Sequence, residues 1–186
     1  MTRFASVPRA RPAALVLAAL VAVSGMDTPA LAAPPTSNCP LFPSTNVWNK
    51  RVDSLPVATN SDALINAIGR ASPLHPDFGE YLGYGIPYNV VDSITPRRTV
   101  AFDYDDESDH VPYPIPGTPE IEGGSDRHLL MWDTQDCRLY ELFNARKTSS
   151  GWRAGSGATW DLNSNALRPN GWTSADAAGL PILPGL

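Results

Sequence analysis

Residues 128–143 read HLLMWDTQDCRLYELF and carry the strongest strand pattern in the chain. The run from His128 to Trp132 is apolar on both faces of an extended chain, which is typical of a central strand in a sheet. Residues 139–143 form a second apolar run. The connection between the two runs, residues 133–137, is rich in turn formers and has the length of a hairpin loop. We therefore predict two neighbouring antiparallel strands.

Two further segments have strand character. Residues 99–104 alternate, and residues 152–161 form a strand in which Gly155 and Gly157 mark a bulge or a close approach of the backbone. The chain has 19 prolines, and each removes a backbone donor and fixes φ, which disfavours long helices. The sequence predicts a mainly β protein, an antiparallel sheet or sandwich with long loops. An α+β fold is the alternative.

One short N-terminal helix is predicted over residues 62–70. Asn60 and Ser61 can cap its start, and Gly69 is placed to end it. Its apolar stripe consists of Leu64, Ile65 and Ile68. Residues 174–178 predict one further helical turn.

The N-terminus has the three parts of a secretory signal peptide. Arg3, Arg9 and Arg11 give a positive start, residues 12–23 form an uncharged apolar run, and residues 30–32 (ALA) fit a signal peptidase. The apolar run is shorter than the roughly 20 residues that span a bilayer, which disfavours the alternative of a membrane anchor. We predict a secreted, extracellular protein.

The domain organisation follows from these features. We predict a signal peptide over residues 1–32, an extended arm over 33–59 and a β-rich domain over 60–186. The chain stops in an uncharged apolar stretch, residues 179–186, of a kind that further chain normally buries. We therefore expect the domain to be truncated at its C-terminus and unstable alone. The alternative is a short form whose tail docks on its own sheet.

The net charge of the chain is −5. The predicted signal peptide carries three Arg and one Asp, so its removal leaves an even more acidic protein. An acidic chain offers no basic stripe for phosphates, which argues against nucleic acid as a partner. It equally disfavours a membrane partner after signal cleavage.

Cys39 and Cys137 are the only two cysteines. In an oxidising compartment an even pair predicts a disulfide, and two distant thiols are too few soft ligands for a metal. A loop of this length makes the bond worth about 4–5 kcal/mol in the chain-entropy model.

Glu141 is the first candidate for chemistry. On its strand it shares a face with Leu139 and Phe143, and a carboxylate on an apolar face has a raised pKa, as a general acid needs. The alternative is an ion pair. If Trp132 pairs with Arg138, then Arg127 lies diagonally across from Glu141.

Asp126 and His128 are two residues apart at the start of the central strand, so we expect both to point to one side. Ser125 beside them suggests a hydrolytic triad, but the chain has no Gly-x-Ser-x-Gly motif. His75 and His110 are distant from His128 and lack metal-ligand spacing, so neither a metal nor a cofactor is predicted.

Residues 103–109 read DYDDESD and place carboxylates at alternate positions. The run resembles the start of a calcium loop but departs from the EF-hand pattern at Ser108 and Pro114. The alternatives are an irregular calcium site and a solvated acidic loop.

Residues 161–174 form a long polar segment that follows Trp160 and contains Trp172 near its end, and we call it the Trp-flanked loop. Long ordered loops on a rigid sheet often carry function. Indole rings stack on sugars, and polar groups such as Asn163 and Asp161 can hold hydroxyls. The loop is therefore a candidate ligand site.

Several motifs together resemble a known family. They are NVWN at 46–49, LHPDFG at 74–79, GIPY at 85–88, PYPIP at 112–116, SDRH at 125–128, LYE at 139–141, and WDLN at 160–163 through GWTSADAAGLP at 171–181. In this order they resemble a family of secreted bacterial proteins known from actinobacteria and soil bacteria. The resemblance covers essentially the whole mature chain and implies export. It implies no mechanism, and it implies a chain that continues past the equivalent of Leu186.

Two functional hypotheses remain. The first is a secreted hydrolase of extracellular polysaccharide or cell-wall glycan, in which Glu141 and Asp161 serve as the acid/base pair with Asp126 and His128 in support. The second is a non-catalytic extracellular domain that binds carbohydrate or a surface through the Trp-flanked loop. The sequence leaves open whether the protein is an enzyme, because only two converging carboxylates separate the hypotheses.

Overall fold

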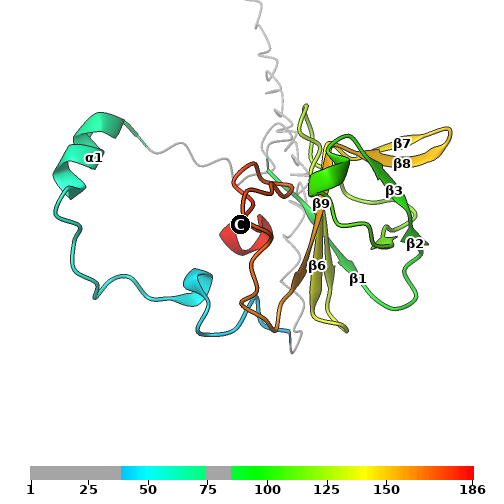
Figure 1. Cartoon of the computed structure of the whole chain (residues 1–186), viewed down its shortest axis with the longest axis horizontal. Helices are drawn as coiled ribbons and strands as arrows, with labels where there is room; N and C mark the ends of the chain where they lie inside the picture. Colours follow the sequence, from blue (N-terminus) through cyan, green and yellow to red (C-terminus); the bar gives the residue numbers. More distant parts are fainter. Residues whose placement is uncertain (1–38, 74–84) are drawn as a thin grey trace, which may run out of the picture. The chain divides into compact units, whose positions relative to one another are not determined.

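The computed structural model describes residues 39–73 and 85–186. The predicted signal peptide and His75 lie outside these residues. The described chain is mainly β, as predicted, with one α-helix and short 3₁₀ turns (Figure 1). In the described part of the chain, no helix is long and apolar enough to cross a membrane.

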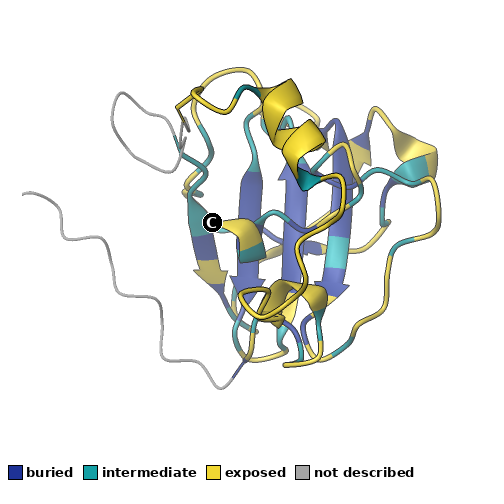
Figure 2. Cartoon of the chain, turned by 90° about the vertical axis from the view of Figure 1, so that its left-hand side faces the viewer, coloured by how far each residue is buried: buried dark blue, intermediate teal, exposed yellow. Residues whose placement is uncertain are grey.

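The main sheet has four strands in the order β1-β5-β6-β9. These are β1 (Tyr88–Val91), β5 (Leu129–Asp133), β6 (Arg138–Phe143) and β9 (Ser156–Asp161). The predicted hairpin is confirmed, since β5 and β6 pair antiparallel, and every residue of β5 is buried (Figure 2). β9 pairs antiparallel with β6, whereas β1 pairs parallel with β5. The sheet is therefore mixed rather than wholly antiparallel.

Two smaller sheets are built from short strands. One pairs β2 (Arg97–Arg98) with β4 (Tyr113–Pro114), and the other has the order β3-β8-β7. Its strands are β3 (Val100–Phe102), β7 (Arg146–Thr148) and β8 (Gly151–Ala154). β3 lies within the predicted strand at residues 99–104 and pairs parallel with β8.

The strand predicted over residues 152–161 is two strands, β8 and β9, separated at Gly155. A Cβ atom at Gly155 would lie 2.6 Å from the ring of Phe143, and one at Gly157 would lie 2.5 Å from the Tyr113 hydroxyl. These distances are too short for any side chain. The predicted close approach at both glycines is therefore confirmed.

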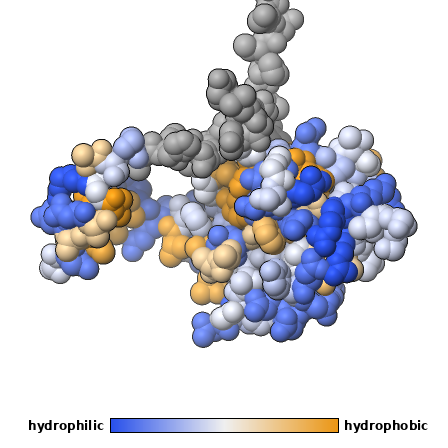
Figure 3. All heavy atoms as spheres, turned by 90° about the horizontal axis from the view of Figure 1, so that it is seen from above, coloured by the Kyte–Doolittle hydropathy of each residue, from blue (hydrophilic) through white to orange (hydrophobic). Residues whose placement is uncertain are grey.

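The helix α1 (Ser61–Ile68) confirms the predicted N-terminal helix and ends at Gly69, whose φ is +105°. Asn60 is its N-cap but makes no side-chain capping hydrogen bond. Figure 3 shows apolar side chains at the surface of this segment. Leu64, Ile65 and Ile68, the members of the predicted stripe, are all exposed, so the stripe does not identify a buried face. Residues 174–178 form a turn and no helix.

Within the described residues, three 3₁₀ turns accompany the strands: η1 (Val47–Asn49), η3 (Asp105–Glu107) and η4 (Leu183–Gly185). All three lie in segments that sequence periodicity does not mark, since each spans only three residues.

The two smaller sheets cover one face of the main sheet, which we call the sheet-covered face. Buried side chains from all three sheets form one core there: Val91, Val100, Phe102, Tyr113, Ile115, Leu129, Met131, Tyr140, Leu142, Ala145 and Ala154. Alternation along each strand places neighbouring residues on the opposite face. One layer of β-structure thus packs on another.

The opposite face, which we call the loop-covered face, is buried by irregular chain from both ends of the described domain. Its core consists of Cys39, Phe42, Leu130, Trp132, Leu139, Ala158, Trp160, Leu162 and Leu183. The apolar tail expected to be exposed is docked: Leu183 is buried and Ile182 packs against this core. Figure 2 shows the C-terminus lying over the buried strands.

Candidate functional site

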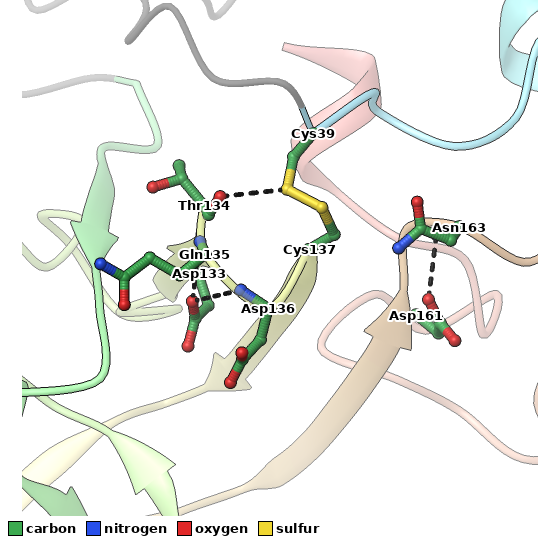
Figure 4. Close-up of a disulfide and its surroundings, with 8 residues drawn as sticks. All are labelled: Cys39, Asp133, Thr134, Gln135, Asp136, Cys137, Asp161 and Asn163. Carbon is green, nitrogen blue, oxygen red and sulfur yellow. Dashed lines mark hydrogen bonds between the residues drawn. A yellow bond between two sulfur atoms is a disulfide. The ribbon is translucent and has the colours of Figure 1, made fainter.

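The predicted disulfide between Cys39 and Cys137 is confirmed (Figure 4). Its Cα atoms are 5.2 Å apart, and the bond joins residues 98 positions apart in the chain. Cys137 lies at the end of the β5–β6 turn and has a φ of +50°. The disulfide therefore fixes the start of the described arm to the hairpin at the centre of the main sheet.

Glu141 points into the loop-covered face and is completely buried. Its Oε1 atom accepts hydrogen bonds from the backbone N–H groups of Ile182 (2.9 Å) and Leu183 (3.0 Å), and Oε2 lies 3.1 Å from the Ile182 nitrogen. Burial raises the pKa of Glu141 to about 7, against the opposing effect of these N–H donors. The Trp160 indole N–H also lowers this pKa through its proximity, although it lacks a hydrogen bond of normal geometry. Glu141 therefore fastens the C-terminal segment to the sheet.

The predicted ion pair between Arg127 and Glu141 is not formed. Trp132 pairs with Leu139 rather than with Arg138, so the register differs by one residue from the one assumed. Arg127 has a φ of +48°, which takes it out of the strand, and its Nε atom donates to the Ala145 carbonyl oxygen.

Glu141 and Asp161 do not converge. Glu141 pairs with Ala158, and Asp161 lies three residues farther along β9, so the two side chains point to opposite faces of the sheet. Asp161 is exposed, and its Oδ1 atom accepts the N–H of Asn163 (Figure 4). An acid/base pair that acts on one bond needs both carboxyl groups in one cleft. The expected pair is thus not brought together.

Asp126 and His128 are also separated. The side chain of Asp126 is exposed and accepts the Ser125 hydroxyl. His128 lies with Nδ1 2.5 Å from the Glu122 carboxylate and Nε2 3.1 Å from the Ala175 carbonyl oxygen. The left-handed Arg127 between them breaks the alternation that the prediction assumed. His128 links two loops to the start of β5.

The acidic run at residues 103–109 is distributed among several partners. Arg146, followed by Arg153, holds the pKa of Asp103 below its usual value. The backbone N–H of Thr173, followed by its hydroxyl, lowers the pKa of Glu107. Residues 39–73 and 85–186 contain no cluster of three metal-ligating side chains. The run cross-links loops in this structure.

Of the predicted sugar-binding residues, Trp160 is buried and Trp172 is half-buried. The guanidinium group of Arg168 lies between their rings, 5.9 Å from the centroid of Trp160 and 5.5 Å from that of Trp172. Arg168 also bonds to Asp109 at 2.7 Å. Arg168 therefore makes a cation–π contact with each of the two rings. Asn163 is exposed and lines neither of the pockets described below.

An apolar pocket of about 260 Å³ lies on the loop-covered face, where the arm, the Trp-flanked loop and the C-terminal segment meet. Its lining residues are Phe42, Thr45, Asn46, Val47, Trp48, Trp160, Asn165, Ala166, Leu167, Gly179, Leu180 and Pro181. Trp48 is 40% exposed, and its ring packs beside Gly185. A Cβ atom added at Gly185 would lie 3.7 Å from the Trp48 ring. The pocket thus has an accessible indole at its rim and the buried Trp160 in its wall.

Two amide side chains in the lining of this pocket, Asn46 and Asn165, are hydrogen-bonded to each other. The Asn46 side-chain N–H donates to Asn165 Oδ1 at 2.8 Å, and the Asn165 side-chain N–H donates to the Thr45 hydroxyl at 3.0 Å. Each carboxamide carries two N–H groups, so each keeps one N–H with no partner in the described chain. These bonds connect residues about 120 positions apart in sequence.

Sequence reasoning did not select Trp48, Asn46 or Asn165 as site residues. Asn46 and Trp48 occur in the motif NVWN, which carried part of the family resemblance, and this motif was the available signal. Comparison with known protein families, characterised proteins and solved structures finds no match to this chain. The resemblance to a secreted bacterial family stays a prediction.

Proposed function

We propose that the protein is a secreted, non-catalytic domain that binds extracellular carbohydrate in the pocket between Trp48 and Asn165. The observation that carries the proposal is the combination, in one pocket, of an accessible indole ring and two linked carboxamides, each with one N–H group that has no partner among the described residues. A sugar presents an apolar C–H face that stacks on an indole and hydroxyls that accept from amide N–H groups. Extracellular polysaccharide and cell-wall glycan are the ligand classes that fit this chemistry.

A binding role fits the described residues better than hydrolysis does. The candidate acid, Glu141, is covered by the backbone of Ile182 and Leu183, and the candidate partner, Asp161, points to the other face. Neither carboxylate lines the pocket. A raised pKa at a buried carboxylate is expected from burial alone and requires no catalytic role.

Secretion is supported by the signal-peptide pattern and by the disulfide, which persists in oxidising compartments. The acidic net charge makes nucleic acid and anionic membranes poor partners. A neutral, hydroxyl-rich ligand avoids charge repulsion by the protein.

The test is binding of the secreted chain to insoluble cellulose, xylan, chitin and peptidoglycan, followed by titration calorimetry with soluble oligosaccharides of whichever polymer retains it. Trp48→Ala should weaken binding by about fivefold or more, because stacking of a base on an aromatic side chain is worth about 1–3 kcal/mol and a sugar face would use the same indole surface. Asn165→Ala should weaken it less, because it removes one of two amides.

Tyr104→Ala is the matched control, because Tyr104 is an aromatic residue with 56% exposure that does not line the pocket. It should bind as the wild type does. Retention of none of the four polymers, or equal losses for Trp48→Ala and Tyr104→Ala, would contradict the proposal. Release of soluble sugar from any polymer would instead support the hydrolase.

A further inference from the structure

A second pocket, of about 450 Å³, lies on the sheet-covered face and has both charged and apolar side chains in its lining. Its lining residues are Arg97, Val111, Pro112, Asp136, Arg138, Tyr140 and Thr159. Tyr140 and Thr159 are register partners on β6 and β9, whereas Trp160 of the first pocket points to the opposite face. The main sheet therefore separates the two pockets.

Arg97 is held in a fixed orientation at this pocket. Its guanidinium donates to the Tyr140 hydroxyl and to Asp133 Oδ2, both at 2.9 Å, and its Cζ atom lies 5.4 Å from the Tyr140 ring centroid. Asp133 is completely buried, and Tyr140 is nearly so. A guanidinium has five N–H groups, so three of those on Arg97 have no hydrogen-bond partner in the described chain. Two buried side chains thus present the remaining donors toward the pocket.

Arg138 supplies a charge that the protein does not neutralise by contact. It is exposed, and within residues 39–73 and 85–186 its guanidinium group makes neither a hydrogen bond nor an ion pair. Asp161 is its register neighbour on β9 but accepts the Asn163 N–H instead. Asp136 lies at the rim, 3.9 Å from Arg97. The pocket lining therefore carries two guanidinium groups and one carboxylate.

We propose that this second pocket binds the carboxylate of a sugar acid, with Arg138 as the main contact and Arg97 as a pre-oriented second donor. Guanidinium and carboxylate groups match in shape and form strong charge-assisted hydrogen bonds. The neighbouring Asp136 and buried Asp133 oppose a dianion such as phosphate and leave room for a single negative charge. Asp136 accepts sugar hydroxyls, and Val111 with Pro112 contacts the C–H face of the ring.

Titration calorimetry of the full secreted chain with glucuronate, glucose and inorganic phosphate tests this inference. Glucuronate and glucose differ at the carboxylate, so glucuronate should bind at least roughly tenfold more tightly than glucose, and also more tightly than phosphate. Arg138→Gln should remove that preference. Arg98→Gln should keep it, because Arg98 is exposed beside Arg97 on β2 and does not line the pocket. Circular dichroism confirms that each variant is folded.

Amide chemical shifts locate the ligand. Glucuronate should shift the amides of Tyr140 and Thr159, and Trp48→Ala should leave its affinity unchanged, whether or not the first pocket binds a glycan. The inference would be overturned by equal affinity for glucuronate and glucose, or by tighter binding of phosphate than of glucuronate. It would also be overturned if Arg138→Gln and Arg98→Gln lost the same amount of glucuronate affinity, or if Trp48→Ala no longer bound glucuronate.

Discussion

The two faces of the main sheet are buried in different ways. The sheet-covered face packs on regular strands, whose backbone groups are paired within their own sheets. The loop-covered face packs on irregular segments from residues 39–49 and 180–186, which have few backbone partners of their own. Irregular chain has more conformational freedom to lose, so it needs specific fasteners. Here the fasteners are a disulfide and the buried carboxylate of Glu141.

This contrast explains where the apolar pocket forms. Regular layers interdigitate closely, and at Gly157 even a methyl group has no room. Irregular chain held at a few points leaves gaps between the points, and the apolar pocket near Trp48 lies in such a gap.

The largest expected effect comes from removing the disulfide. Replacing Cys39 and Cys137 together by Ser should lower the free energy of unfolding by about 4–5 kcal/mol, because the bond closes a loop that spans 98 positions. Chemical denaturation of the oxidised and variant proteins measures this. A loss below about 1 kcal/mol would show that the arm is held by packing alone.

The hairpin at residues 128–143 could be predicted because its apolar pattern is long and its partners are close in sequence. The parallel partner of β5, residues 88–91, lies about 40 positions away, and no local pattern encodes such a pairing. The strands β2, β4 and β7 have two or three residues each, too few for a period to appear.

The candidate site was predicted in part. Glu141 was correctly placed on an apolar face, because alternation along a strand is reliable. Its partners are backbone N–H groups of Ile182 and Leu183, which have no side-chain signature in a sequence. Trp48 and Asn165 meet only through the tertiary fold, so their pocket could not be predicted from spacing.

Leu183→Ala on the loop-covered face should lower the free energy of unfolding by about 3 kcal/mol, as expected for a large-to-small change at a buried leucine. The matched control is Leu142→Ala on the sheet-covered face, where the lost volume is the same. Because the C-terminal segment lines the apolar pocket, Leu183→Ala should also weaken oligosaccharide binding, while Leu142→Ala should not. If Leu183→Ala and Leu142→Ala lowered the oligosaccharide affinity equally, binding would not depend on the loop-covered face in particular.

Gly157→Ala probes the sheet-covered face. We expect it to lower the free energy of unfolding by about 2 kcal/mol, because the added methyl group overpacks the core. The added methyl group would meet the Tyr113 hydroxyl at 2.5 Å and the Phe102 ring at 2.6 Å. Thermal denaturation measures the loss. Unchanged stability would mean that this face adapts as readily as the loop-covered one.

Glu141 holds the C-terminal segment on the sheet, and among the described residues it has no cationic partner. Its pKa is raised from 4.5 to about 7 in the folded protein. Between these pH values the folded state holds a proton that the unfolded chain releases, so stability falls as pH rises through this window. Between about pH 5 and pH 8, the titration of Glu141 should lower the free energy of unfolding by about 2 kcal/mol.

The most direct measurement is the free energy of unfolding of the wild type and of Glu141→Gln across this pH range. The glutamine oxygen can still accept the N–H groups of Ile182 and Leu183, but the side chain no longer titrates. We expect the wild type to lose about 2 kcal/mol relative to the variant as pH rises, while oligosaccharide binding by the variant is kept. Parallel stability curves for the two proteins would contradict the account.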